Sequence, residues 1–154
     1  MKGAKENVRV VCRVRPQNEM ERERGSVCVK LTKTTISVNV DDCASPFTFD
    51  RVFGMESTQQ QVFEDTAFHL IDDVLTGYNA TIFAYGQTSS GKTFTMEGPD
   101  INNAEKRGII PRTVDALFAG VRMAAESIEF TIKISYVEIY MEKIRDLLGT
   151  ITII

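Results

Sequence analysis

Apolar and polar side chains alternate in several short stretches of the first fifty residues. In "VRVVCRVRP", residues 8–16, every second position is apolar. This alternation predicts a strand that ends at Pro16, because proline has no N–H group to donate to a ladder. The runs "SVCVKL" and "TISVNV" flank "TKT" and predict an antiparallel hairpin. A further short aromatic alternation, "SPFTFDRVFG", ends at Gly54.

The spacing changes from two residues to three and four in the middle of the chain. Apolar side chains recur at helical spacing from Val62 to Leu75, which predicts a helix with one buried face. Ser57 is the expected N-cap with Gln60 in the capping-box position, and Gly77 fits the C-terminal stop. The apolar run "ATIFAY", residues 80–85, then predicts a strand buried on both faces of a sheet.

The remaining third of the chain repeats this change from helical to strand-like spacing. "RGIIPRTVDALFAGV" predicts a turn and then a helix that begins near Pro111. Residues 128–140 are rich in Ile, Val, Phe and Tyr, and predict one long strand or a strand pair. "MEKIRDLL" predicts a short amphipathic turn or helix. Helices and strands that alternate around a buried sheet predict an α/β fold.

Composition excludes several classes of protein. The 154 residues include 43% hydrophobic and 25% charged residues, as expected for one globular domain. The net charge is −3, with a basic N-terminal stretch and an acidic segment at 41–73, and shows no concentrated basic surface for nucleic acid. We expect neither a membrane span nor a signal segment, because no apolar run is long enough to span and the first residues are polar and charged. Cys12, Cys28 and Cys43 lack metal spacing and predict reduced cysteines, and the lone His69 predicts no metal site.

One segment carries a recognisable binding chemistry. It matches the phosphate-loop pattern G-x-x-x-x-G-K-[ST] and comprises Gly86, Gln87, Thr88, Ser89, Ser90, Gly91, Lys92 and Thr93. The glycines allow backbone N–H groups to turn around phosphate oxygens, and the Lys92 ammonium reaches the outer phosphates. The Thr93 hydroxyl is the expected Mg²⁺ ligand, at the positive end of a helix. The loop therefore predicts binding of a nucleoside triphosphate with Mg²⁺, and leaves kinases, GTPases and motors open.

The wider segment "YGQTSSGKTFTMEG" resembles the kinesin motor family, in which this start and finish of the loop are distinctive. Other segments resemble the same family in the same order: "VRVVCRVRP", "FTFDRVFG", "STQQQVFE", "GYNATIFAYGQT", "RGIIPR" and "ISYVEIYMEKIRDLL". The resemblance is greatest to the conventional, cargo-transporting kinesins. It covers residues 7–148 and leaves 149–154 as a divergent apolar tail. It implies a phosphate-loop NTPase of the kinesin/myosin type, with a central mixed sheet and helices on both faces.

The resemblance also implies roles for particular residues. Arg13, Arg15 and Pro16 match a family segment that packs around the adenine of ATP, and Phe94 takes the position beside the base. For Phe94 the alternative is a core aromatic at a helix start. ATP and Mg²⁺ are the implied cofactors, and microtubules, built of tubulin, are the implied partner. A homodimer in a longer form and a location in the cytoplasm on the microtubule cytoskeleton are implied as well, with neither nucleic acid nor membrane as a partner.

Two segments that the family uses for hydrolysis do not occur in this sequence. These are N-x-x-S-S-R-S-H, which positions the attacking water, and D-L-A-G-S-E, which supports Mg²⁺. No catalytic residue is identified, and we expect a truncated motor domain that binds ATP, whose enzymatic activity the sequence leaves open. Two other hypotheses are a non-catalytic nucleotide- or tubulin-binding fragment and an unrelated phosphate-loop kinase.

Overall fold

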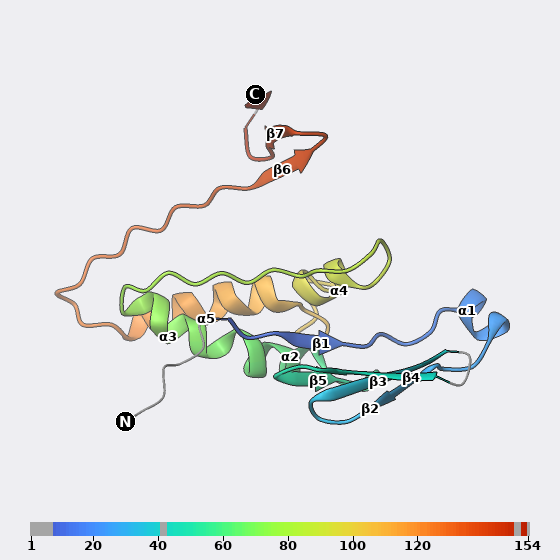
Figure 1. Ribbon diagram of the computed structural model, residues 1–154. Helices are drawn as coiled ribbons and strands as arrows, with labels where there is room; N and C mark the ends of the chain where they lie inside the picture. Colours follow the sequence, from blue (N-terminus) through green and yellow to red (C-terminus); the bar gives the residue numbers. More distant parts are fainter. Residues whose placement is uncertain (1–7, 41–42, 150–151, 154) are drawn as a thin grey trace. The chain divides into compact units, whose positions relative to one another are not determined.

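The computed structural model describes residues 8–40, 43–149 and 152–153, in two units, Met1–Arg122 and Met123–Ile154. The basic residues Lys2 and Lys5 and part of the apolar tail (150–151 and 154) lie outside the described residues. The first unit contains β1 (Val11–Arg13), α1 (Glu19–Arg24), β2 (Val29–Leu31), β3 (Thr35–Val40), β4 (Cys43–Thr48), β5 (Arg51–Phe53), α2 (Gln59–Thr66), α3 (Phe68–Leu75), α4 (Lys92–Met96) and α5 (Ile109–Met123, ending at the boundary) (Figure 1). The second contains β6 (Val137–Tyr140), β7 (Lys143–Asp146) and β8 (Thr152–Ile153).

The strand predicted at residues 8–16 is present as β1, with only its central three residues in a ladder. It pairs in parallel with β5, so that Cys12 lies opposite Val52. Beyond the ladder, the Val14 N–H donates to the Phe53 carbonyl at 2.9 Å. The pairing places the residues that follow β1 at one end of this small sheet, where the candidate site lies.

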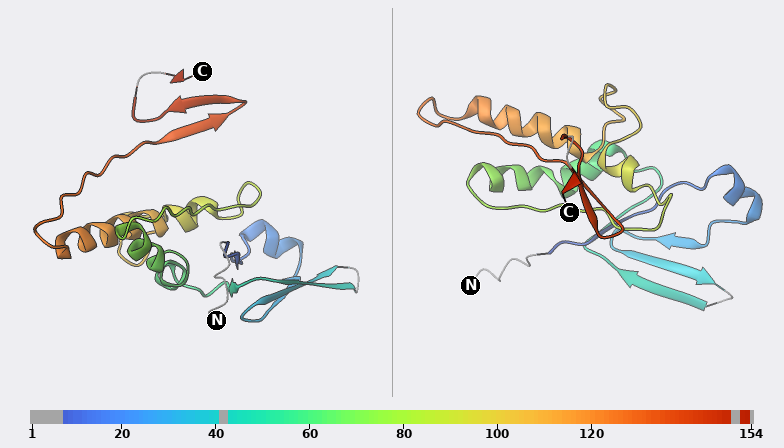
Figure 2. Two further views of the ribbon diagram at one scale, coloured as in Figure 1. Left: turned by 60° about the vertical axis from the view of Figure 1, so that its left-hand side comes forward. Right: turned by 90° about the horizontal axis from the view of Figure 1, so that it is seen from above.

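The predicted hairpin is confirmed and carries a third strand. β2, β3 and β4 form an antiparallel sheet in the order β2-β3-β4 (Figure 2). The Thr32 N–H donates to the Thr35 carbonyl at 2.8 Å, and the Thr32 hydroxyl accepts the Thr35 N–H at 2.9 Å. The stretch "SPFTFDRVFG" divides between two sheets, because β4 pairs with β3 whereas β5 pairs with β1.

The single helix expected after residue 57 is two helices, α2 and α3, that meet at Ala67. The predicted N-cap, Ser57, is wrong by one residue. The Thr58 hydroxyl accepts the Gln61 N–H at 3.2 Å, and the Gln61 side chain accepts the Thr58 N–H at 3.0 Å, a reciprocal capping box. The predicted stop at Gly77 is confirmed, since its φ of 99° is the left-handed conformation that ends many helices.

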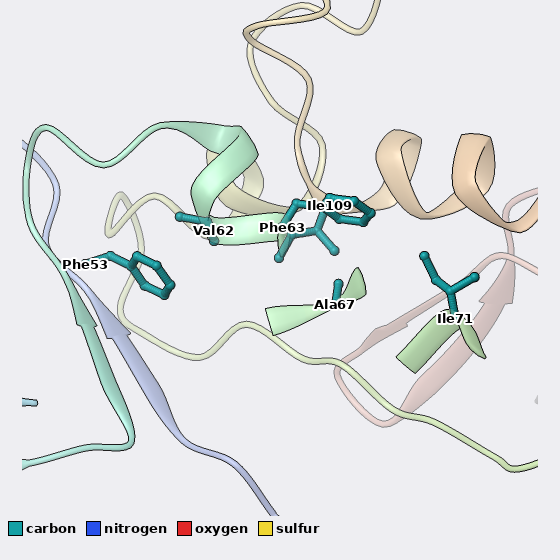
Figure 3. Packing of buried hydrophobic residues seen from close by; sticks show 6 residues of the cluster. All are labelled: Phe53, Val62, Phe63, Ala67, Ile71 and Ile109. Carbon is teal, nitrogen blue, oxygen red and sulfur yellow. The ribbon is translucent and has the colours of Figure 1, made fainter. Parts of the chain in front are cut away.

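The helical apolar face builds the core of the first unit. Figure 3 shows the side chains of this core, which come from β5, α2, α3 and α5: Phe53, Val62, Phe63, Ala67, Ile71 and Ile109. Phe63 also meets the exposed ring of Phe68 edge to face, with ring centroids 6.0 Å apart. The two helices therefore pack their common apolar stripe against β5 and the start of α5.

Helix α5 begins at Ile109, close to the start predicted near Pro111, and closes a loop at residues 97–108. The buried Arg112 holds this loop: its Nε donates to the Arg107 carbonyl at 3.0 Å and its Nη2 to the Ala104 carbonyl at 2.6 Å. Its Nη1 donates to the side chain of Gln60 on α2. None of the helices in the described residues has both the length and the apolar character needed to cross a membrane.

The prediction of a buried strand at residues 80–85 is wrong. Although the segment is apolar, it forms no strand and pairs with none of the strands among the described residues. A strand needs a neighbour for its N–H and C=O groups, and apolar composition does not supply one. Phe83 and Tyr85 are 80% and 94% exposed.

In the second unit, the long strand or strand pair predicted at 128–140 is reduced to β6. Within this range only the β6 residues pair with another described strand, β7. Of the turn or helix predicted for "MEKIRDLL", the turn is present at its first two residues and the helix is wrong, because β7 follows, antiparallel to β6 and to β8. Met141 and Glu142 form the two-residue turn with φ values of 49° and 63°, the conformation that joins twisted strands of a hairpin. Sheets and helices are thus mixed, as the α/β class requires, and the strands of the described residues form three separate small sheets.

Candidate nucleotide-binding site

The phosphate-loop segment wraps tightly in front of α4. Gly91 is the N-cap of α4 with a φ of 97°, and Ser89 has a φ of 65°. A Cβ atom added at Gly86 would lie 2.5 Å from the Ser90 hydroxyl. Both pattern glycines adopt positive φ values that favour glycine, and Gly86 also leaves room for the Ser90 side chain.

Backbone N–H groups are free around this turn. Of the backbone N–H groups of residues 87–94, only that of Ser90 donates a hydrogen bond within the described residues, to the Gln87 carbonyl at 3.2 Å. The free N–H groups follow from local geometry, since the first turn of a helix has no carbonyl ahead of it. N–H groups that converge in this way form a cradle for an anion.

The Lys92 ammonium folds back over the loop. Its Nζ donates to the Gly86 carbonyl at 2.8 Å and to the Gln87 carbonyl at 2.9 Å. Both partners are neutral, and no ion pair to Lys92 is formed with any described acidic residue. The positive charge therefore stays available to a phosphate that enters the cradle.

Arg15 reaches the loop from the end of β1. Its Nε donates to the Ser89 carbonyl at 2.9 Å, while its Nη1 and Nη2 donate to the Glu21 carboxylate at 2.7 and 2.5 Å. The ion pair with Glu21 raises the pKa of Arg15. Arg15 thus belongs to the wall of the site and joins it to α1.

Arg13 points into a different environment from Arg15. Its Nη1 donates to Gln59 Oε1 at 2.7 Å and to Thr95 Oγ1 at 3.0 Å. Its guanidinium carbon lies 5.1 Å from the centroid of the Phe94 ring. Burial lowers the pKa of Arg13, and the neutral acceptors offset part of the cost of burying its charge. Arg13 therefore fixes β1 against α2 and α4, and supports the ring of Phe94.

A cavity of about 630 Å³ lies between β1, the segment before the loop and α4. It brings together most of the residues that the sequence assigns to the nucleotide: Arg13, Arg15, Pro16, Ser89, Ser90, Gly91, Lys92 and Phe94. Gly86, Gln87, Thr88 and Thr93 belong to the same loop and lie outside the lining of this cavity. Thr93 is exposed on the first turn of α4, which leaves its hydroxyl open to a metal ion.

Sequence reasoning missed two residues that shape the site. Glu21 holds Arg15, and its signal is the spacing Asn18-x-x-Glu21, a capping box in front of a short helix. Gln59 is 5% exposed and holds Arg13, and no local pattern marks it. The contact joins residues 46 positions apart, so it depends on the fold.

Comparison with known proteins identifies the family. The Kinesin motor domain family model matches residues 13–152. Kinesin heavy chain of Botryotinia fuckeliana is 47% identical over 144 residues, covering 92% of this chain and 16% of that protein. Kinesin-1 heavy chain of Rattus norvegicus is 50% identical over 142 residues, covering 92% of this chain and 14% of that protein. Among solved structures, "Structure of a fast kinesin: Implications for ATPase mechanism and interactions with microtubules" matches with a TM-score of 0.88 and 45% identity, covering 92% of this chain and 41% of that one.

These matches confirm the α/β class and the kinesin type of phosphate-loop fold. The chain belongs to the kinesin motor domain family. The hypothesis of an unrelated phosphate-loop kinase is therefore wrong. The chain spans about a sixth of the length of the curated heavy chains that it matches.

Proposed function

We propose that this chain is the ATP-binding part of a microtubule-based motor. In this proposal, residues 7–148 of the chain form the N-terminal part of a kinesin motor domain. The observation that carries the proposal is the loop from Gly86 to Thr93, with free N–H groups and a lysine whose hydrogen bonds to described residues go to loop carbonyls. These features fit a polyphosphate chain, because N–H dipoles and an ammonium group stabilise several negative oxygens at once.

The chain's own residues then divide the work of holding ATP with Mg²⁺. The loop N–H groups and Lys92 bind the phosphates, and the Thr93 hydroxyl is the protein ligand to Mg²⁺. The bound ion supplies charge neutralisation on the phosphates. Pro16 and Phe94 both line the same cavity, and we expect them to flank the adenine.

Microtubules are the proposed partner, and the microtubule cytoskeleton of the cytoplasm is the proposed location. Membership of the kinesin family supports both proposals. The similar solved structure of a fast kinesin also supports them, because it concerns an ATPase mechanism and interactions with microtubules. A homodimer belongs to the proposed full-length form. The second candidate is a non-catalytic nucleotide- or tubulin-binding fragment, and the chimera described below distinguishes it from the motor.

Nucleotide binding is tested with Lys92→Ala in the 154-residue chain. We expect the substitution to weaken MgATP binding by about 2–3 kcal/mol or more, since a charge-assisted phosphate contact is lost. Lys106→Ala is the matched control, because it removes an exposed lysine near the same helix. Calorimetric titration measures both affinities. Equal ATP affinity in the parent and the Lys92 variant would refute the site.

Motor activity is tested in a chimera. The matching part of the solved fast kinesin is replaced by this chain, which is 45% identical to it. We expect microtubules to stimulate phosphate release by the chimera, and Lys92→Ala to abolish that stimulation. A chimera that binds ATP and shows no stimulation would favour the non-catalytic candidate.

A further inference from the structure

Helix α1 and the phosphate loop are joined through one arginine. The Arg15 side chain donates to both carboxylate oxygens of Glu21 and, through Nε, to the Ser89 carbonyl at 2.9 Å. The side chains of Arg15 and Glu21 are 33% and 38% exposed, so neither is freely solvated. A guanidinium held at both ends in this way has little freedom to rotate, because its fork is planar and rigid.

Glu21 is itself fixed by the start of α1. Its Oε2 accepts the Asn18 N–H at 2.9 Å, and its own N–H donates to Asn18 Oδ1 at 2.8 Å. The hydrogen bond from Arg15, followed by that from Asn18, lowers the pKa of Glu21 to about 2. The carboxylate is therefore charged at neutral pH and can hold Arg15 in place.

The contact at Ser89 determines where the next N–H group points. A peptide group is planar, so the Ser89 carbonyl and the Ser90 N–H are fixed together. Ser89 has a φ of 65°, a conformation that non-glycine residues rarely adopt without support. By holding the Ser89 carbonyl, Arg15 also orients the Ser90 N–H, which donates to the Gln87 carbonyl and closes the cradle.

We propose that Glu21 is a positioning residue for nucleotide binding, which acts through Arg15 to hold the Ser89–Ser90 peptide and so keeps the phosphate cradle in its binding shape. The inference rests on the proposed function and adds to it a residue outside the phosphate-loop pattern. The described hydrogen bonds of Glu21 go to Arg15 and Asn18 and not to the loop, so its effect passes through Arg15.

The test compares Glu21→Gln with Glu23→Gln in the 154-residue chain. Both remove one negative charge from α1, and Glu23 is exposed with no ion pair among the described residues. Simple electrostatics predicts that losing a negative charge near the loop tightens binding of anionic ATP. Loss of the positioning contact predicts the opposite, and we expect Glu21→Gln to weaken MgATP binding about fivefold to tenfold.

Exchange of the Ser90 amide hydrogen, measured without nucleotide, gives a second readout. We expect faster exchange in Glu21→Gln than in the parent or in Glu23→Gln, with the amides of β3 unchanged. Weaker binding together with faster Ser90 exchange supports the inference. Unchanged or tighter binding in Glu21→Gln, while Lys92→Ala still weakens binding as expected, overturns the inference and leaves the proposed function intact. If the parent binds no ATP, the proposed function fails. Equal Ser90 exchange in the parent, Glu21→Gln and Glu23→Gln overturns the inference whatever the result for ATP.

Discussion

Gln59 is a buried amide whose hydrogen bonds connect three parts of the first unit. Its Oε1 accepts from Arg13 of β1, and its Nε2 donates to the Phe94 carbonyl at 2.7 Å and to the Lys106 carbonyl at 3.1 Å. All three hydrogen bonds are partly buried, so water does not readily replace a lost partner. A single side chain thus holds β1, α4 and the loop at 97–108 together.

We expect Gln59→Ala to destabilise the chain by about 1–3 kcal/mol, because it leaves the Arg13 guanidinium and two carbonyls without a partner. Gln17→Ala is the matched control, since the Gln17 amide donates to the Gly25 carbonyl in an exposed setting and should cost less than about 1 kcal/mol. Urea unfolding of both variants measures the difference. Equal unfolding midpoints in the two variants would show that the Gln59 bonds carry no net stability.

At this scale the sequence predicts the local turn of the loop, and it does not predict the contacts around it. The left-handed turn at Gly91 lies within the short phosphate-loop pattern, which records local backbone chemistry. The direction of Arg13 depends on Gln59, far along the chain, and no local pattern contains it. Polar pairs between residues far apart in the chain cannot be predicted from the sequence alone.

At the scale of elements, two glycines draw the ends of the loop at 97–108 together. The Gly108 N–H donates to the Glu97 carbonyl at 2.8 Å. A Cβ atom at Gly108 would lie 2.5 Å from both the carbonyl carbon and the oxygen of Met96. Gly98 has a φ of 87°, and a Cβ there would lie 2.2 Å from the Lys106 carbonyl oxygen. The crossing therefore has no room for side chains, since backbone atoms cannot rotate away.

We expect Gly108→Ala to destabilise the chain by about 1–3 kcal/mol, the usual cost of overpacking a tight contact. Gly25→Ala is the control, because its added methyl meets nothing within 4 Å and its φ of 168° is ordinary extended backbone. That control should unfold at the same denaturant concentration as the parent or slightly higher. A Gly108 variant as stable as the Gly25 variant would contradict close packing at this crossing.

A short sequence pattern predicts an element when the contacts that form the element are made by residues close together in the chain. The hairpin of β2 and β3 and the stop at Gly77 were predicted because turns and caps involve neighbours in sequence. The strand β7 was not predicted, because Met141 and Glu142 adopt positive φ without the Asn or Gly that marks a hairpin turn. Only the pairing of β6 with β7 shows that this turn joins two strands.

At the scale of the molecule, apolar surface exceeds what a small core covers. The described core contains eight buried hydrophobic residues, whereas many large apolar side chains of both units are exposed. The segment at 80–85 combines unpaired backbone with exposed rings at Phe83 and Tyr85. Strand pairing is a long-range property, so its absence at this segment could not be predicted from an apolar run.

We expect the 154-residue chain, studied by itself, to self-associate through the segment at 80–85, since exposed apolar backbone pairs readily with a second copy. Light scattering after size exclusion should give a mass above the 17.3 kDa of one chain, rising with concentration. Tyr85→Lys should lower this mass, because a charged side chain opposes edge pairing. Tyr78→Lys is the matched control, as Tyr78 is 70% exposed and lies outside the segment. A monomer at every concentration, or equal effects of the two lysine variants, would show that this segment does not drive association.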